Sequence, residues 1–287
     1  MVISMEIKVL GSAQDGGVPH VACYCQTCNY ARENPVAVRL APSLGIYDPQ
    51  NGNAYVIDAS PDFPKQLDML YKEVGKLRGK ERFLPDAIFL THGHFGHIWG
   101  LGYLGREACS PKELPLYCTH DVAEFLRRNR PFADLVQRQN VIINELEPGA
   151  PINFSGFSIT PLKVPHRQDF TDTVGYIISG KNIKLLYVPD MDDYTDEIIQ
   201  AINAVDIALL DGCFYSTEEI PYRNIKEIPH PFIPHSMEKL AGLVGKTKIY
   251  FTHFNHTNYL LRQGRQEKEQ LIARGYHMLN DGDVFTI

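Results

Sequence analysis

The stretch "THGHFGHIWG", residues 91–100, places three imidazoles within six positions, at His92, His94 and His97. It directly follows the apolar run "AIFL", which is typical of a strand. A spacing of two on an extended backbone points the side chains of His92 and His94 to the same side. His97 then begins an apolar helical pattern. The stretch therefore predicts a metal site at the carboxyl end of a strand.

Composition limits the kinds of partner. The chain has 287 residues, 44% of them hydrophobic, and a net charge of −6, so it can bury a sizeable core and offers no broad surface for a polyanion. It contains no run of about 18 apolar residues and no basic segment followed by a long apolar one near its start. We expect a cytoplasmic protein with a small-molecule substrate, and neither a membrane nor a nucleic acid as partner. The oligomeric state stays open, with a homodimer among the alternatives.

Short apolar or β-branched runs predict strands. They lie at residues 7–11, 54–58, 87–91, 114–118, 157–164, 174–179, 184–188, 207–211, 248–253 and 284–287. The runs fall into two groups, before and after about residue 150, and helical patterns accompany each group. We therefore predict an α/β fold, a four-layer αββα sandwich. It would form one domain over residues 1–287, built from two similar halves, about 1–150 and 151–287.

Helical patterns lie between several of these runs. They cover residues 62–75, 98–104, 120–129, 193–203, 236–244 and 259–274. Asp121 and Ser236 are expected to open two of these helices. In the pattern that follows the histidines, we expect Trp99, Tyr103 and Leu104 to form a buried helix face.

Further candidate ligands stand at the ends of other predicted strands. His166 follows "LKVP", Asp190 follows "LLYVP", and His253 closes "KIYFT". Each alone is a common turn residue. Together with the histidine cluster they supply the imidazoles and carboxylate that a catalytic Zn²⁺ or Fe²⁺ site needs.

Three cysteines form the pattern Cys-x-Cys-x-x-Cys at Cys23, Cys25 and Cys28. The spacing does not resemble the disulfide framework of a secreted protein, and three such close thiols indicate a zinc site. Partly buried free cysteines are the alternative. A tetrahedral zinc needs a fourth ligand, for which the candidates are His20, Cys118 and His256.

The order of five motifs resembles the metallo-β-lactamase superfamily. These motifs are "IDAS" (57–60), "THGHFGH" (91–97), "VPH" (164–166), "VPD" (188–190) and "FTH" (251–253). The resemblance implies that one metal ion binds His92, His94 and His166, and that Asp190 bridges to it or joins it. His97 and His253 would face a second ion. Asp58 would hydrogen-bond a ligand imidazole, with a strand-end Asp that caps the next segment as the alternative.

The chain departs from that family at Gly96, where the family's motif carries an acid. We therefore expect one tightly held ion in this site and a second that is weak or absent. With the cysteine site, this amounts to about two ions per chain. Cys25→Ala and His94→Ala should each remove a different ion.

Two branches of the superfamily are similar to this chain in further motifs. One is the cyclic ribose phosphate phosphodiesterase of phosphonate breakdown, and it implies a structural zinc on Cys23, Cys25, Cys28 and His256. The other is the B protein of pyrroloquinoline quinone biosynthesis, and it matches more widely. Four stretches of this chain resemble its characteristic motifs: "IKVLGSAQDGG" (7–17), "DASPDF" (58–63), "LLDGCF" (209–214) and "HTN" (256–258).

These features favour a hydrolase that uses a metal-activated water on a small anionic ester such as a phosphodiester. Asp190 would orient that water. The stretch "PHPFIPHS" (229–236) offers His230 and His235 as proton donors. His235 resembles a histidine of the transfer-RNA-processing branch and would act as general acid or phosphate contact, with a surface histidine in a Pro-rich loop as the alternative. Zn²⁺ is the expected ion of both sites, with Fe²⁺ or Mn²⁺ as alternatives in the active site.

Two other classes of function stay open. Three imidazoles and a carboxylate also suit an iron-dependent oxygenase of cofactor biosynthesis. The third class is a metal-stabilised carrier or scaffold without activity, because the same fold can serve unrelated functions. A failure of His92, His94, His166 and Asp190 to converge would favour this last class.

Overall fold

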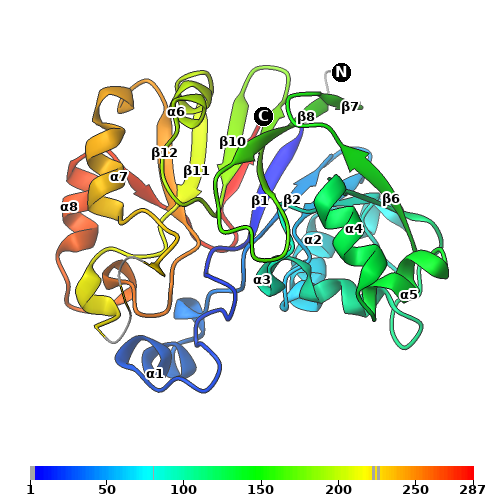
Figure 1. Ribbon diagram of the computed structural model, residues 1–287, viewed down its shortest axis with the longest axis horizontal. Coiled ribbons are helices and arrows are strands. Elements are labelled where there is room, and N and C mark those ends of the chain that lie inside the picture. Colours follow the sequence, from blue (N-terminus) through cyan, green and yellow to red (C-terminus); the bar gives the residue numbers. More distant parts are fainter. Residues whose placement is uncertain (1–3, 80, 222–223, 225–226) are drawn as a thin grey trace.

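The strands form two mixed sheets that face each other, with helices on both outer faces (Figure 1). The computed structural model describes residues 4–79, 81–221, 224 and 227–287. Within this part, the first seven-stranded sheet has the order β14-β1-β2-β3-β4-β5-β6 and the second has the order β13-β12-β11-β10-β9-β8-β7. The four-layer αββα prediction is confirmed.

The strand bounds are as follows. The first sheet contains β1 (Glu6–Gly11), β2 (Ser43–Tyr47), β3 (Ala54–Ile57), β4 (Ala87–Phe89), β5 (Leu114–Thr119), β6 (Val141–Leu146) and β14 (Val284–Thr286). The second contains β7 (Ile152–Phe154), β8 (Phe157–Val164), β9 (Thr173–Ser179), β10 (Lys184–Val188), β11 (Ile207–Asp211), β12 (Lys248–Thr252) and β13 (His277–Met278).

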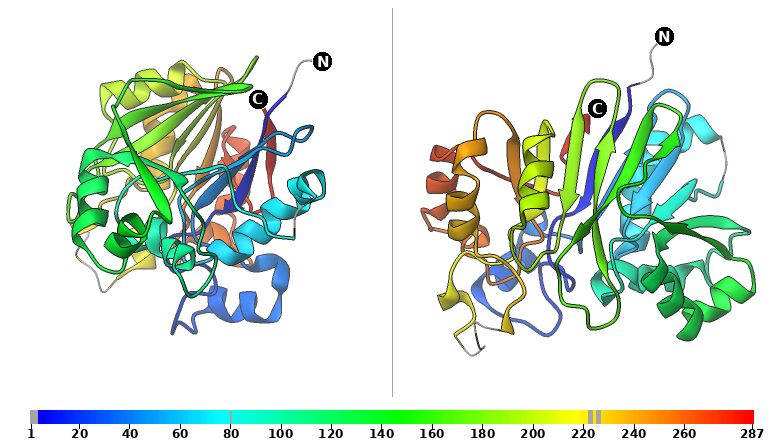
Figure 2. Two further views of the ribbon diagram at one scale, coloured as in Figure 1. Left: turned by 90° about the vertical axis from the view of Figure 1, so that its right-hand side faces the viewer. Right: turned by 45° about the horizontal axis from the view of Figure 1, so that its top comes forward.

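The described helices are α1 (Gln26–Glu33), α2 (Phe63–Arg78), α3 (Phe95–Ile98), α4 (His120–Arg128), α5 (Phe132–Gln137), α6 (Asp196–Asn203), α7 (Ile233–Lys239) and α8 (Glu267–Ala273). Apolar side chains of α2, α4 and α5 pack on the first sheet, and those of α6, α7 and α8 on the second. Figure 2 shows the helices on the outer sides of the two sheets. None of the helices described is long and apolar enough to cross a membrane.

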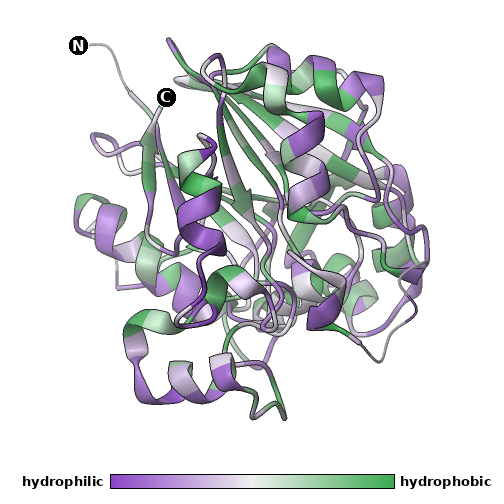
Figure 3. Cartoon of the chain, turned by 90° about the vertical axis from the view of Figure 1, so that its left-hand side faces the viewer, coloured by the Kyte–Doolittle hydropathy of each residue, from purple (hydrophilic) through white to green (hydrophobic). Residues whose placement is uncertain are grey.

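The central core lies between the two sheets. Inner-face side chains such as Ile7 and Leu44 of the first sheet and Ile159 and Leu185 of the second are fully buried in one cluster. Many strands are buried on both faces, which explains why they read as continuous apolar runs. Figure 3 shows this contrast between largely hydrophobic strands and helices with hydrophilic stretches. Burial of this apolar surface holds the two sheets together.

The last strand, β14, does not belong to the sheet that its position in the sequence predicted. Strands β1 to β6 precede residue 150 and β7 to β13 follow it, as predicted. However, β14 pairs with β1 in the first sheet, with Glu6 opposite Thr286. An unpaired β1 would leave backbone groups exposed at a sheet edge, so the C-terminal segment returns to cover it.

The segment after the histidines also differs from its prediction. Residues 99–104 form a 3₁₀ helix, in which side chains three positions apart lie above one another. Leu101 and Leu104 occupy the buried face, whereas Trp99 and Tyr103 are 52% and 43% exposed. The prediction of a buried face was therefore right for Leu104 and wrong for the two aromatic residues.

Strand direction brings the polar strand ends to one edge. Strands β3 to β6 are mutually parallel, as are β10 to β12. In sheets of this kind, ligands bind beyond the carboxyl ends of the strands. Asp58, His92, Asp190, Asp211 and His253 all lie at or just after such ends, and α3 lies in the middle of this edge (Figure 1).

Candidate metal centres

His92, His94 and His166 form the first group of ligand atoms. They follow β4 and β8, they are all buried, and their ligand atoms lie within 4.8 Å of one another. Nε2 of His92 is 2.8 Å from Nδ1 of His94. Burial lowers the pKa of His94 to about 4 and also lowers the pKa values of His92 and His166. These imidazoles are therefore neutral at neutral pH, which is the form that binds a metal ion.

Asp190 lies between this group and a second group, which consists of His97 and His253. Its Oδ1 is 3.6 Å from Nε2 of His166. Its Oδ2 is 3.0 Å from Nε2 of His97 and 3.3 Å from Nε2 of His253. Burial opposes ionisation of Asp190, but His253 and His97 hold its pKa well below the ordinary value. One carboxylate thus faces two sets of imidazoles, as a bridging ligand does.

Unpaired buried atoms show that the site fits a cation. Among the described residues, Nε2 of His97, Nε2 of His253 and Oδ2 of Asp190 are buried and have no hydrogen-bond partner. Each such atom costs about 1–3 kcal/mol if it stays unpaired. A metal ion between them would satisfy all three at once, which no arrangement of apolar neighbours could do.

Asp58 orients one of these imidazoles. Its Oδ2 lies 2.8 Å from Nδ1 of His97, and its Oδ1 accepts a hydrogen bond from the backbone N–H of Thr91 at 2.8 Å. With the His97 proton on Nδ1, the lone pair of Nε2 points into the site. Asp58 has φ +66° and His253 has φ +60°, a strained conformation for residues with side chains and one that recurs at functional sites.

Asp58→Asn should lower the zinc affinity of this site by about 10- to 100-fold, the usual effect of removing such a partner. The backbone N–H of Thr91 needs an acceptor, so the amide oxygen of the new side chain would stay at the Oδ1 position and the amide nitrogen would face His97. That nitrogen donates to Nδ1, so the imidazole proton would move to Nε2. A competition titration with a zinc indicator measures the change. The control is Asp48→Asn, a buried acid that caps the turn at Gln50. An unchanged affinity in Asp58→Asn would contradict this role.

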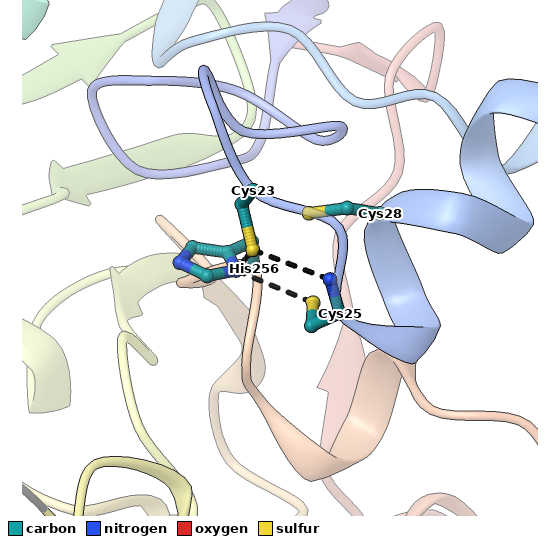
Figure 4. A group of neighbouring side chains, drawn as sticks. All are labelled: Cys23, Cys25, Cys28 and His256. Atoms are coloured by element: carbon teal, nitrogen blue, oxygen red, sulfur yellow. Dashed lines mark hydrogen bonds between the residues drawn. The ribbon is translucent and has the colours of Figure 1, made fainter.

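The cysteine cluster forms a separate candidate centre (Figure 4). Cys23, Cys25 and Cys28 lie before and at the start of α1, and His256 follows β12. Their ligand atoms lie within 4.8 Å of one another. Nδ1 of His256 is 3.4 Å from Sγ of Cys23 and 3.6 Å from Sγ of Cys25. This donor set suits a tetrahedral structural zinc.

The other two candidates for the fourth ligand lie elsewhere. Cys118 is buried in the core between the first sheet and its helices. The ring of His20 lies beside that of His256, tilted by 35° with centroids 4.6 Å apart, and His256 is the candidate whose ligand atom groups with the three thiols. The structure thus brings together the four residues that the resemblance implied.

The two histidines of residues 229–236 have different surroundings. The His235 side chain is 45% exposed, and its Nε2 lies 3.3 Å from Asp193. Helix α7 begins at Ile233, so Ser236 does not open it as expected, because Pro234 already suits the first turn. His230, in contrast, is buried beside the first two groups, with ring centroids 5.5 Å from His166 and 5.7 Å from His253.

His230 is paired with Asp211 at the end of β11. Its Nδ1 lies 2.7 Å from Oδ2 of Asp211. Burial would lower the pKa of His230, but Asp211 raises it above the ordinary value. From the sequence, His230 is the less favoured of the two histidines. The signal that could have favoured it is Asp211, which closes the strand "IALLD". His230, rather than His235, is thus buried beside the candidate metal groups, and its ligand atom also lies with those of Asp190, Asp211 and His253.

Imidazoles and carboxylates at the carboxyl edge of an αββα sandwich define a metal-binding protein with the metallo-β-lactamase fold. Residues 53–254 match the family model described as beta-lactamase superfamily domain. The chain therefore belongs to the metallo-β-lactamase superfamily, as its motifs implied.

Individual relatives agree with the two branches. Coenzyme PQQ synthesis protein B of Methylorubrum extorquens is 28% identical over 97% of this chain and 98% of its own length. The crystal structure of Zn²⁺-bound PqqB from Methylobacterium extorquens has a TM-score of 0.82 at 23% identity, covering 98% of this chain and 100% of that one. A diphosphatase of the PhnP family has a TM-score of 0.73 at 24% identity, covering 100% and 98%.

Proposed function

We propose that this protein is a metal-dependent hydrolase of small anionic esters, with phosphodiesters as the first class to test. The observation that carries the proposal is the position of Asp190, whose two oxygens face two sets of buried imidazoles. His92, His94, His166 and Asp190 would hold the metal ion. A bound Zn²⁺ lowers the pKa of water to about 7 and polarises the bond that breaks.

The chain itself supplies the proton transfers. Asp190 has acceptor oxygens at the centre of the site and would hold the attacking water by a hydrogen bond. His230 would donate a proton to the leaving-group oxygen, and Asp211, at 2.7 Å, orients the imidazole and favours its charged form. A buried proton donor beside the metal-binding groups favours hydrolysis over a scaffold without activity.

One arginine, paired with Asp169, and two exposed aromatic rings lie beside the first group of histidines and suit a substrate with an apolar part. Arg167 directly follows His166, and its positive charge contributes to the lowered pKa of His94. Phe95 and Phe170 are 55% and 50% exposed and stack with ring centroids 6.0 Å apart. The Phe170 ring also lies 5.7 Å from that of His94. The fold shared with a PhnP-family diphosphatase supports the phosphoester class.

His230→Gln tests both the reaction and the proton donor. With an alkyl alcohol as leaving group, kcat of phosphodiester hydrolysis should fall by about 10²- to 10⁴-fold. With p-nitrophenol it should change much less, because p-nitrophenolate leaves without a proton. His235→Gln is the matched control and should leave both rates unchanged.

Two outcomes would count against these assignments. Equal losses on both substrates in His230→Gln would exclude His230 as the proton donor. If the metal-loaded wild type hydrolysed no ester, lactone or phosphodiester faster than His94→Ala, the proposed function would be wrong.

A second candidate function is favoured by the full-length similarity to coenzyme PQQ synthesis protein B. Three imidazoles with one carboxylate suit Fe²⁺ in oxygenases. Purification without air would then yield stoichiometric iron, with oxygen uptake in the presence of tyrosine-like substrates. A protein that holds only zinc and consumes no oxygen would exclude this candidate.

A further inference from the structure

We infer that Asp15, to which no motif assigns a role, replaces the carboxylate missing at position 96 and completes a second metal position with His97, His253 and Asp190. The inference builds on the metal centre of the proposed function but does not depend on the reaction. It revises the expectation that Gly96 leaves the second position weak or absent.

The space beside Gly96 is filled by Asp15. A Cβ atom added to Gly96 would lie 1.9 Å from Oδ1 of Asp15 and 2.6 Å from its Cγ. Any side chain at position 96 would therefore collide with this carboxylate. Glycine at position 96 and aspartate at position 15 fit together, and the acid reaches the site from a different loop.

The Asp15 carboxylate lies at ligand distance from the second group. Its Oδ1 is 3.7 Å from Nε2 of His97 and 3.9 Å from Nε2 of His253. The same two nitrogens lie 3.0 and 3.3 Å from Oδ2 of Asp190. Ligands bound tetrahedrally at about 2.0–2.2 Å are about 3.4 Å apart. The four observed separations lie on both sides of that value.

The atoms of this group lie at ion-pair distances from one another, but the buried ones among them make no hydrogen bond within the described part of the chain that would satisfy them. Nε2 of His97, Nε2 of His253 and Oδ2 of Asp190 have no hydrogen-bond partner among the described residues. Asp15 is the half-exposed member, with 48% of its side chain accessible. It therefore closes the solvent side of a group whose other members are buried.

Backbone hydrogen bonds hold the Asp15 loop against the end of β12. Gln14 N–H donates to the carbonyl of Phe254 at 2.9 Å, and Phe254 N–H donates to the carbonyl of Ser12 at 3.0 Å. Gln14 and Phe254 directly flank Asp15 and His253. The two proposed ligands are thus positioned by one short stretch of paired backbone, although they are far apart in sequence.

Zinc content at saturation tests the inference. Wild type should hold three ions per chain, counting the cysteine site, and Asp15→Ala should hold two. Gly96→Ala should also hold two, because its methyl group displaces the carboxylate while Asp15 itself is kept. Asp134→Ala is the matched control, since Asp134 on α5 is also 48% exposed but pairs with Arg138 just after that helix. It should hold three.

Cobalt substitution provides a second readout. Two Co²⁺ ions that share Asp190 should show magnetic coupling by electron paramagnetic resonance, and Asp15→Asn should lose it while thermal unfolding shows an intact fold. Three ions with unchanged affinity in Asp15→Ala, or only two ions in wild type, would overturn the inference. Wild type that holds three ions but hydrolyses nothing would overturn the proposed function and leave this inference standing.

Discussion

Asp190→Ala should lower the rate of hydrolysis at saturating zinc by about 10³-fold or more. Losing a partner of one ligand already costs about 10- to 100-fold in affinity or activity, and Asp190 serves both groups directly. Its two oxygens lie 3.0–3.6 Å from nitrogens of His97, His253 and His166. The variant also removes the acceptor that would hold the attacking water.

The measurement is kcat with zinc in excess, together with zinc content. Asp193→Ala is the control, because this nearby carboxylate is 62% exposed and lies 3.3 Å from Nε2 of the half-exposed His235. Its rate should equal that of wild type. An Asp190→Ala rate within tenfold of wild type would show that Asp190 is not the central ligand.

Cys25→Ala should destabilise the whole fold while leaving the active site intact. A structural zinc binds only the folded chain, so at a free zinc concentration a thousandfold above its Kd it adds about 4 kcal/mol to the free energy of unfolding. The four ligands join the loop before α1 to the segment after β12. Cutting this connection should lower stability by a similar amount and remove one zinc ion.

Denaturant titrations with and without a chelator measure this effect. Chelation should destabilise wild type by more than it destabilises Cys25→Ala, because the variant has no cysteine-bound ion to lose. Cys109→Ala is the control, since Cys109 is a free, partly exposed cysteine outside the cluster. If Cys25→Ala unfolded at the same denaturant concentration as wild type, the cysteine cluster would have no structural role.

The strand ends could be predicted from local patterns, because each is marked by an apolar run followed directly by polar residues. His92 and His94 follow an apolar run, and Asp190 and His253 follow two others, so parallel strands had to bring them to one edge. Short or mixed strands were missed: β13 has two residues, and β6 alternates little in "VIINEL". Helices α1 and α5 were missed as well.

Contacts between distant loops could not be predicted in this way. No local pattern predicts that Asp15 fills the space beside Gly96, because that contact depends on how the loop that carries Asp15 pairs with Phe254. The preference for His230 over His235 likewise depends on Asp211, which ends another strand. Such pairings are set by tertiary packing rather than by sequence spacing.

Anomalous diffraction at the zinc edge from zinc-saturated crystals tests the central claim most directly. The account predicts a peak within bonding distance of His92, His94, His166 and Asp190, in addition to one at the cysteine cluster. A map with zinc at the cysteine cluster and none at those four residues would contradict it.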